Sequence, residues 1–374
     1  PNIQVGTGYK QVDILNNTSW RVNEDIFIRF NNQFSTTSNI PRYDNLQDYK
    51  DGELKWSEWS YGPQTRLMSS LDVNSYKESK FFDGNNLTLA YQFIEEDRIT
   101  RKVQSDEYNN TYIDAHVTSL NWDFTLDKLV YGLELTNNNI LSTATEGTQT
   151  RYPSGGSRLS TAALYGSYKK EVNEHFVWNV GARYSQVFGE MSFNETDPVF
   201  VTDHIKFNNG ALTGNVNLIY KPTNTWKFDW VASSGFRAPN IDDYGKVFVK
   251  RGDMVIPNPD LTPEYAYNGE MSITKKWENL QVTSNFYYTH LQDVIVKKDL
   301  GYTQFYEYEE VNVQTLMNSP EAYIYGWSLG VKSKITPWLF FEESFTWQKG
   351  WDVSNDEPLG HIPPAFNKSL IKIK

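Results

Sequence analysis

The 374-residue sequence contains no cysteine and no long hydrophobic run. The absence of cysteine excludes thiol catalysis, thiolate metal sites and disulfides. No apolar stretch approaches the roughly 18 consecutive residues that a transmembrane helix needs. A membrane-spanning interpretation must therefore rest on β-strands, because only helices and closed barrels pair every backbone polar group within lipid.

An excess of positive charge is also missing, since the formal net charge is −11. Such a balance disfavours a nucleic-acid backbone as a partner. The sequence has no GxSxG elbow, no phosphate-binding Walker loop and no HExxH zinc motif. We therefore expect neither an enzyme nor a resident cofactor or structural metal.

Aromatic residues are abundant instead. They supply 15% of the chain, whereas all hydrophobic residues together supply only 39%, and the mean hydropathy is −0.59. A soluble core is normally filled with aliphatic side chains, but membrane barrels concentrate Tyr, Trp and Phe at the two bilayer interfaces. A polar lumen keeps the average hydropathy low. The composition therefore favours a transmembrane β-barrel.

Alternating polar and apolar residues, bounded by turn residues, predict about fifteen strands. The predicted strands cover 10–22, 26–37, 64–78, 84–97, 112–126, 128–142, 160–171, 174–188, 210–221, 225–235, 265–277, 279–295, 322–333, 337–348 and 366–374. Several are longer than the roughly 5–6 residues that are usual in globular proteins. This length suits a tilted membrane span with an extension beyond it.

The links between the predicted strands alternate in length, seven times over. The short links lie at 23–25, 79–83, 127, 172–173, 222–224, 278 and 334–336. The long links lie at 38–63, 98–111, 143–159, 189–209, 236–264, 296–321 and 349–365. Tight turns on one side and long loops on the other are typical of an up-and-down membrane barrel, whereas a β-sandwich has turns of mixed length.

Two motifs bracket the long link 236–264. The first is Phe236, Arg237, Ala238 and Pro239, and the second is Asn258, Pro259, Asp260 and Leu261, followed by Pro263 and Glu264. The prolines stiffen the link and block ladder hydrogen bonds. An arginine at a strand end can point into a polar lumen and pair with a carboxylate.

With these two boxes in order, and with 362–366 before a late strand, the chain resembles the barrel of TonB-dependent outer-membrane receptors. The segments 151–157 and 236–246 are similar to receptors of the Bacteroidetes group. The resemblance implies a plugged barrel of roughly 22 strands, in contact with outer-membrane lipid and lipopolysaccharide. We expect this chain to be a partial barrel, without the N-terminal plug, the first strands and the closing strand.

The resemblance also implies a function. Such receptors take up iron–siderophore complexes, haem, cobalamin or similar scarce ligands, with energy from the TonB–ExbB–ExbD complex acting through the plug. We expect an iron–siderophore complex as the ligand, with haem or a haemoprotein as the alternative. A passive porin, a surface adhesin and an outer-membrane hydrolase are the other classes, although no Ser/His spacing predicts a hydrolase.

Candidate ligand contacts lie in the long links. They are the aromatic residues Trp56, Trp59, Tyr244, Tyr302, Phe305 and Tyr306. Aromatic side chains give large contact areas at low entropy cost, but packing of a loop on itself is the alternative. Haem-uptake relatives carry a ligand histidine between the two boxes, and residues 240–257 contain none. Tyr244 or Met254 could bind iron in its place, and the missing histidine makes haem the second choice of ligand.

Two histidines and two acidic stretches can be interpreted either as functional or as ordinary solvated residues. His204 and His361 could face a ligand, although a solvated loop histidine is the simpler interpretation. The acidic stretches 95–97 and 307–310 are interpreted as solvated faces, with divalent-cation bridging to lipopolysaccharide as the alternative.

Overall fold

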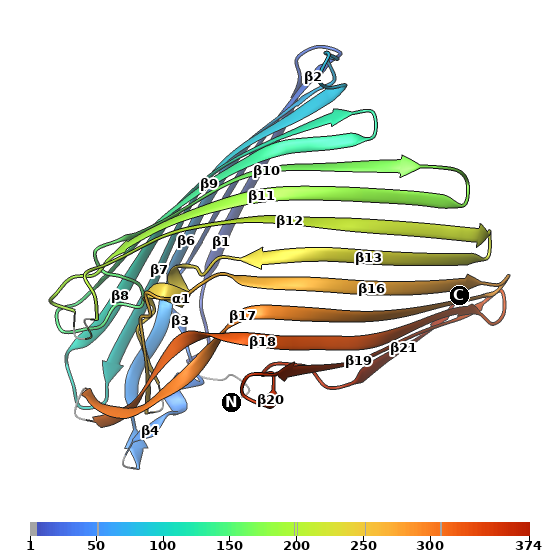
Figure 1. The fold of residues 1–374 in the computed structure, drawn as a ribbon. Coiled ribbons are helices and arrows are strands. Elements are labelled where there is room, and N and C mark those ends of the chain that lie inside the picture. The colour runs from blue at the N-terminus through green and yellow to red at the C-terminus, as the bar shows by residue number, and fades with distance from the viewer. Residues whose placement is uncertain (1–5, 51, 198, 200, 251, 307–308) are drawn as a thin grey trace.

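The computed structural model describes residues 6–374 except 51, 198, 200, 251 and 307–308. Nearly all of this chain forms one strongly curved antiparallel sheet that runs in chain order from β1 to β21 (Figure 1). Its long strands are β1 (Gln11–Arg21), β2 (Ile26–Thr37), β6 (Trp56–Ser75), β7 (Gly84–Lys102), β8 (Tyr108–Leu126), β9 (Leu129–Ala144), β10 (Ser157–Glu171), β11 (Phe176–Ser192), β12 (His204–Thr223), β13 (Trp226–Arg237), β16 (Glu264–Lys276), β17 (Leu280–Tyr306), β18 (Glu309–Lys334), β19 (Leu339–Asp352) and β21 (Phe366–Ile373).

The remaining elements are short and belong to the long links. They are β3 (Ile40–Pro41), η1 (Asn45–Gln47), β4 (Tyr49–Lys50), β5 (Glu53–Leu54), α1 (Ile241–Gly245), β14 (Phe248–Lys250), β15 (Asp253–Ile256) and β20 (Glu357–Pro358). Among the described residues, no helix is long and apolar enough to cross a membrane.

The all-β barrel wall predicted from the sequence is confirmed. Each predicted strand overlaps one long strand of the sheet, and each strand pairs antiparallel with the next along the chain. Short turns join the strands at one end of the sheet and long links join them at the other end (Figure 1). We call these the short-turn end and the long-link end.

Several predicted boundaries were wrong at the long-link end. β17 continues to Tyr306 and β18 begins at Glu309, so most of the predicted loop 296–321 is a hairpin. β6 likewise begins at Trp56, inside the predicted loop 38–63. A membrane span needs only about 9–11 residues per strand. Beyond it both faces meet water, the apolar alternation disappears, and only backbone pairing maintains the strand.

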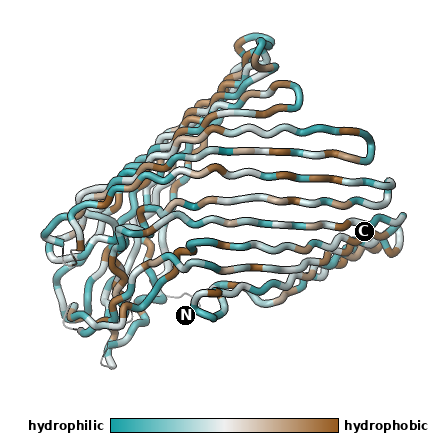
Figure 2. Tube along the Cα trace, viewed as in Figure 1, coloured by the Kyte–Doolittle hydropathy of each residue, from teal (hydrophilic) through white to brown (hydrophobic). Residues whose placement is uncertain are grey.

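The outer face of the sheet is apolar and exposed. Leu164, Tyr184 and Leu212 lie side by side across β10, β11 and β12, and Leu164 and Leu212 are 64% and 73% exposed. At the short-turn end, Trp226, Phe228 and Trp230 stack along β13. Hydrophobic residues are scattered along every strand and do not form continuous runs (Figure 2). This is the pattern of a lipid-facing wall with an interfacial aromatic belt.

The inner face is polar, and its side chains bridge strands that are not adjacent. The Tyr165 hydroxyl on β10 donates to Asp123 on β8, and Gly132 on the intervening β9 leaves room for the ring. Tyr287 on β17 reaches Gln348 on β19 in the same way, with a hydroxyl-to-oxygen distance of 2.7 Å, across Gly326 on β18. Long polar side chains therefore tie the wall together from the lumen side.

The long links fold inward over the long-link end of the wall (Figure 1). Ile241, Tyr244 and Leu261, from the link between β13 and β16, form a buried cluster with Met191 and Ile205 of the inner face. A second cluster joins Val247 and Met254 to Val311 and Val313 of β18, beside the parallel pairing of β15 with β18. The mouth of the barrel is therefore lined by folded, packed segments.

The glycine beneath Tyr165 provides a test of this wall. A Cβ on Gly132 would lie 2.6 Å from the Trp122 carbonyl oxygen and 2.7 Å from the Tyr165 hydroxyl. We expect Gly132→Ala to lower the free energy of unfolding by about 1–3 kcal/mol, the usual effect of overpacking. The measurement is the urea concentration at which the heat-modifiable folded band of the receptor disappears. Gly269→Ala, which would meet no atom within 4 Å, is the control, and equal midpoints would contradict the prediction.

Candidate functional site

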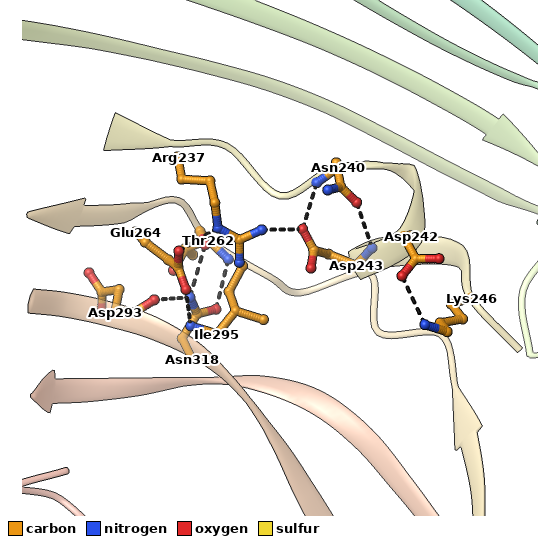
Figure 3. Close-up of polar contacts among 10 residues, drawn as sticks. All are labelled: Arg237, Asn240, Asp242, Asp243, Lys246, Thr262, Glu264, Asp293, Ile295 and Asn318. Carbon is orange, nitrogen blue, oxygen red and sulfur yellow. Dashed lines mark hydrogen bonds and ion pairs between the residues drawn. The ribbon is translucent and has the colours of Figure 1, made fainter. Parts of the chain in front are cut away.

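The first box of the link between β13 and β16 ends in a charged cluster (Figure 3). Arg237 is the last residue of β13, and its Nε donates to Glu264 Oε2 at 2.5 Å while its Nη1 lies 2.6 Å from Asp243 Oδ2. Glu264 is the first residue of β16 and also accepts the Ile295 backbone N–H at 2.5 Å. One guanidinium therefore holds the two ends of the link together at the rim of the wall.

The short helix α1 begins directly after this box, because Pro239 lacks the N–H that would extend the strand. Asn240 is its N-cap, and its side chain accepts from the Asp243 backbone N–H at 3.0 Å. The Asp243 carboxylate accepts in return from the Asn240 backbone N–H at 2.9 Å. This reciprocal capping box places Asp243 where Arg237 can reach it.

Tyr244 anchors the link in the interior and is only 1% exposed. Its hydroxyl donates to the Leu261 carbonyl oxygen at 2.8 Å, and its ring stacks on Phe207 with centroids 4.3 Å apart. Burial raises the pKa of the Tyr244 phenol. Tyr244 and the fully buried Met254 are therefore packed side chains in this structure, and a ligand contact or iron bond by either stays a prediction.

The second box is fastened to the β17–β18 hairpin. Asn258 Nδ2 donates to the Leu316 carbonyl at 2.7 Å, and Asn258 Oδ1 accepts the Asp260 backbone N–H at 3.0 Å. Asn318 forms a pair of 2.9 Å hydrogen bonds with the backbone of Thr262. The residues of both boxes thus bend a long link and fix it against the neighbouring strands. Their contacts in this structure are structural.

The remaining predicted ligand contacts lie on strands. Tyr302 and Phe305 are 50% and 68% exposed on β17, while Tyr306 packs against the second buried cluster. Trp56 begins β6, with the Lys55 ammonium 5.2 Å from its ring centroid. His204 lies near Glu190 of β11, at 3.7 Å, and His361 is exposed with a φ of 62°.

Around Trp59 the structure brings together the aromatic residues of the link 38–63 and two arginines that sequence reasoning missed. Trp59 and Tyr61 form an edge-to-face pair with centroids 5.0 Å apart. The guanidinium groups of Arg42 and Arg98 both lie over these rings, at 5.2–5.7 Å. We call Arg42, Trp59, Tyr61 and Arg98 the arginine–aromatic cluster. The two-residue alternation along β7 was the available signal for Arg98, but Arg42 comes from an irregular link that no periodicity describes.

Comparison with known proteins identifies the family. A model of the family described as TonB dependent receptor-like, beta-barrel, matches residues 2–366. The chain belongs to the TonB-dependent receptor β-barrel family, whose members are outer-membrane proteins. No curated protein gives a significant match.

Solved structures agree on the fold. The copper transporter OprC superposes with a TM-score of 0.77 at 14% identity over 98% of this chain and 58% of its own. The Serratia marcescens hemophore receptor HasR gives 0.71 at 11% identity over 91% of this chain and 54% of its own. The ferric yersiniabactin receptor FyuA of Yersinia pestis gives 0.65 at 16% identity over 96% and 56%. The chain therefore spans just over half the length of these structures.

The Arg237 cluster predicts a specific loss of order. Arg237→Gln leaves Asp243 and Glu264 without their cation, and we expect a cost of about 1–3 kcal/mol confined to the link 238–263. The measurement is the rate at which chymotrypsin cuts this link on intact cells, which should rise. Lys206→Gln, which removes an exposed pair to Glu190 worth about 0–1 kcal/mol, is the control. Equal cleavage rates for Arg237→Gln and the unsubstituted receptor would contradict the assignment.

Proposed function

We propose that this receptor takes up a scarce ligand across the outer membrane with energy delivered by the TonB–ExbB–ExbD complex. The proposal rests on the structure of the mouth. Packed links and aromatic and arginine side chains line it above a polar inner face, as a receptor that selects one solute requires. A passive porin needs an open mouth and no such lining.

An iron–siderophore complex is the ligand we propose. The family includes structures described as siderophore receptors, a hemophore receptor and a copper transporter. A haem receptor is the alternative, but the link between the boxes contains no histidine, and the two residues that could replace it, Tyr244 and Met254, are buried. The packing of this link therefore favours a ligand whose iron is already enclosed by its own chelator.

Uptake by a deletion strain tests the proposal. Cells that lack the gene encoding this chain should lose accumulation of ⁵⁵Fe supplied as one ferric siderophore, and the restored gene should recover it. A protonophore added to the restored strain should abolish accumulation but leave surface binding, because the inner-membrane gradient powers passage. Haemin and cyanocobalamin are the comparison ligands. Unchanged uptake of all three classes by the deletion strain would refute the proposed function.

A further inference from the structure

Arg98 is placed on the inner face of the wall. Leu89 and Tyr91 of β7 are each 39% exposed, as lipid-facing residues are. The pairing of β7 with β8 continues without a register shift to Arg101. Because successive side chains alternate between faces, Arg98 faces the lumen, close to the long-link end where the mouth lies.

The Arg98 guanidinium rests on an aromatic floor. It lies 5.5 Å from the Trp59 centroid and 5.7 Å from the Tyr61 centroid. Arg42 lies over the same two rings, at 5.3 and 5.2 Å. Two guanidinium groups thus share one edge-to-face aromatic pair. The rings orient both groups, but they do not neutralise the charge of either.

The two arginines differ in their counter-ions. Arg42 forms a bidentate pair with Asp44, at 2.6 and 2.8 Å. The hydrogen bonds from Arg42 lower the pKa of Asp44 to about 2, so the pair loses its negative partner only when the pH falls toward that value. Arg42 is therefore satisfied at any physiological pH.

Arg98 has no such partner in the part of the chain that the structure describes. No carboxylate of the described residues lies within ion-pair distance of Arg98, and its Nε is buried without a hydrogen-bond acceptor among them. Glu96, two residues before Arg98 on the same face of β7, accepts a hydrogen bond from Gln64 at 2.9 Å. Arg98 is therefore a half-buried cation that rests on aromatic rings and has no anion beside it. Its charge and its N–H donors remain available to a ligand.

The link 143–159 lies in the neighbourhood of Tyr61 and Arg98. In that link Arg151 pairs with Asp242 of α1 at 3.3 Å and lies over the Tyr152 ring. Burial raises the pKa of the Tyr152 phenol, and the charges of Asp242, Glu96 and Arg98 all act on it. Arg98 therefore lies near the folded links at the long-link end of the wall.

We propose that Arg98, supported by Trp59 and Tyr61, binds an anionic oxygen of the transported ligand, a carboxylate or a catecholate. The guanidinium offers a planar donor fork that matches such oxygens, and the rings beneath it favour a flat group stacked alongside. This inference rests on the proposed function and narrows its ligand to an anionic chelate. A bare metal cation would leave Arg98 unpaired, and a cobalamin, whose acid side chains are amides, offers no carboxylate or catecholate. Ferric siderophores and the propionates of haem share the required chemistry.

Binding by receptor variants tests the proposal. The intact receptor is expressed in the outer membrane as the wild type, Arg98→Gln, Arg98→Lys and Arg101→Gln. Arg101 lies on the outer face of the same strand and bonds to the Ser105 carbonyl at 3.2 Å, so it is the matched control. The probes are ⁵⁵Fe with a carboxylate siderophore, ⁵⁵Fe with a catecholate siderophore, haemin, and cyanocobalamin as the ligand without a carboxylate or catecholate. Heat-modifiability on gels reports whether each variant has folded.

We expect one of the three anionic probes to bind the wild type. The probe that binds shows whether the oxygen bound by Arg98 belongs to a carboxylate siderophore, a catecholate siderophore or a haem propionate. Arg98→Gln should weaken its binding by about tenfold to a hundredfold, as loss of a charged hydrogen bond does. Arg98→Lys should be intermediate, because it keeps the charge without the fork, and Arg101→Gln should bind like the wild type.

Two results would overturn the inference and leave the proposed function intact. They are equal affinities of the wild type and folded Arg98→Gln, and binding of cyanocobalamin alone. If Arg98→Gln does not fold, Arg98→Lys alone decides, and wild-type affinity in that variant would overturn the inference. Uptake that is unaffected by deletion of the gene would reject the proposed function itself.

Discussion

Backbone hydrogen bonding within lipid is the constraint on which the rest of this structure depends. A peptide N–H or C=O that finds no partner in the hydrocarbon region costs several kcal/mol, so each spanning strand must be paired along its length. Continuous antiparallel pairing from β1 through β21 meets this requirement. It also leaves one face free to be apolar and the other free to be polar.

The same pairing explains how the mouth is built. Where strands rise beyond the membrane, water satisfies the backbone, and links can leave the ladder. These links return over the lumen because their apolar residues, such as Tyr244 and Leu261, find a packing surface on the inner face at Met191. The Arg237 ion pairs then close the bend at its base. The residues of the two boxes therefore fasten a folded link to the wall.

The wall was predictable from the sequence because a lipid-facing strand has a strict period of two. Segments such as 210–221 carry that signal, and β12 is found there. The extension of β17 to Tyr306 was not predictable, since polar residues such as Lys297 and Lys298 carry no facial pattern outside the membrane. The burial of Tyr244 was not predictable for a related reason. A tyrosine in a link looks solvent-facing in sequence, and only the tertiary packing of α1 shows that it is buried.

The arginine–aromatic cluster lies at the limit of such reasoning. The alternation places Arg98 on the inner face, but whether it has a counter-ion depends on segments far apart in the chain. Asp44 follows Arg42 in an irregular link and neutralises it locally. Glu96, on the same face of β7, bonds to Gln64 and forms no ion pair with Arg98 in the described part of the chain. An arginine without a counter-ion costs much free energy when it is fully buried, and less when it lies beside a water-filled lumen. Its position at the mouth is therefore consistent with a charge kept available for a partner that arrives from outside.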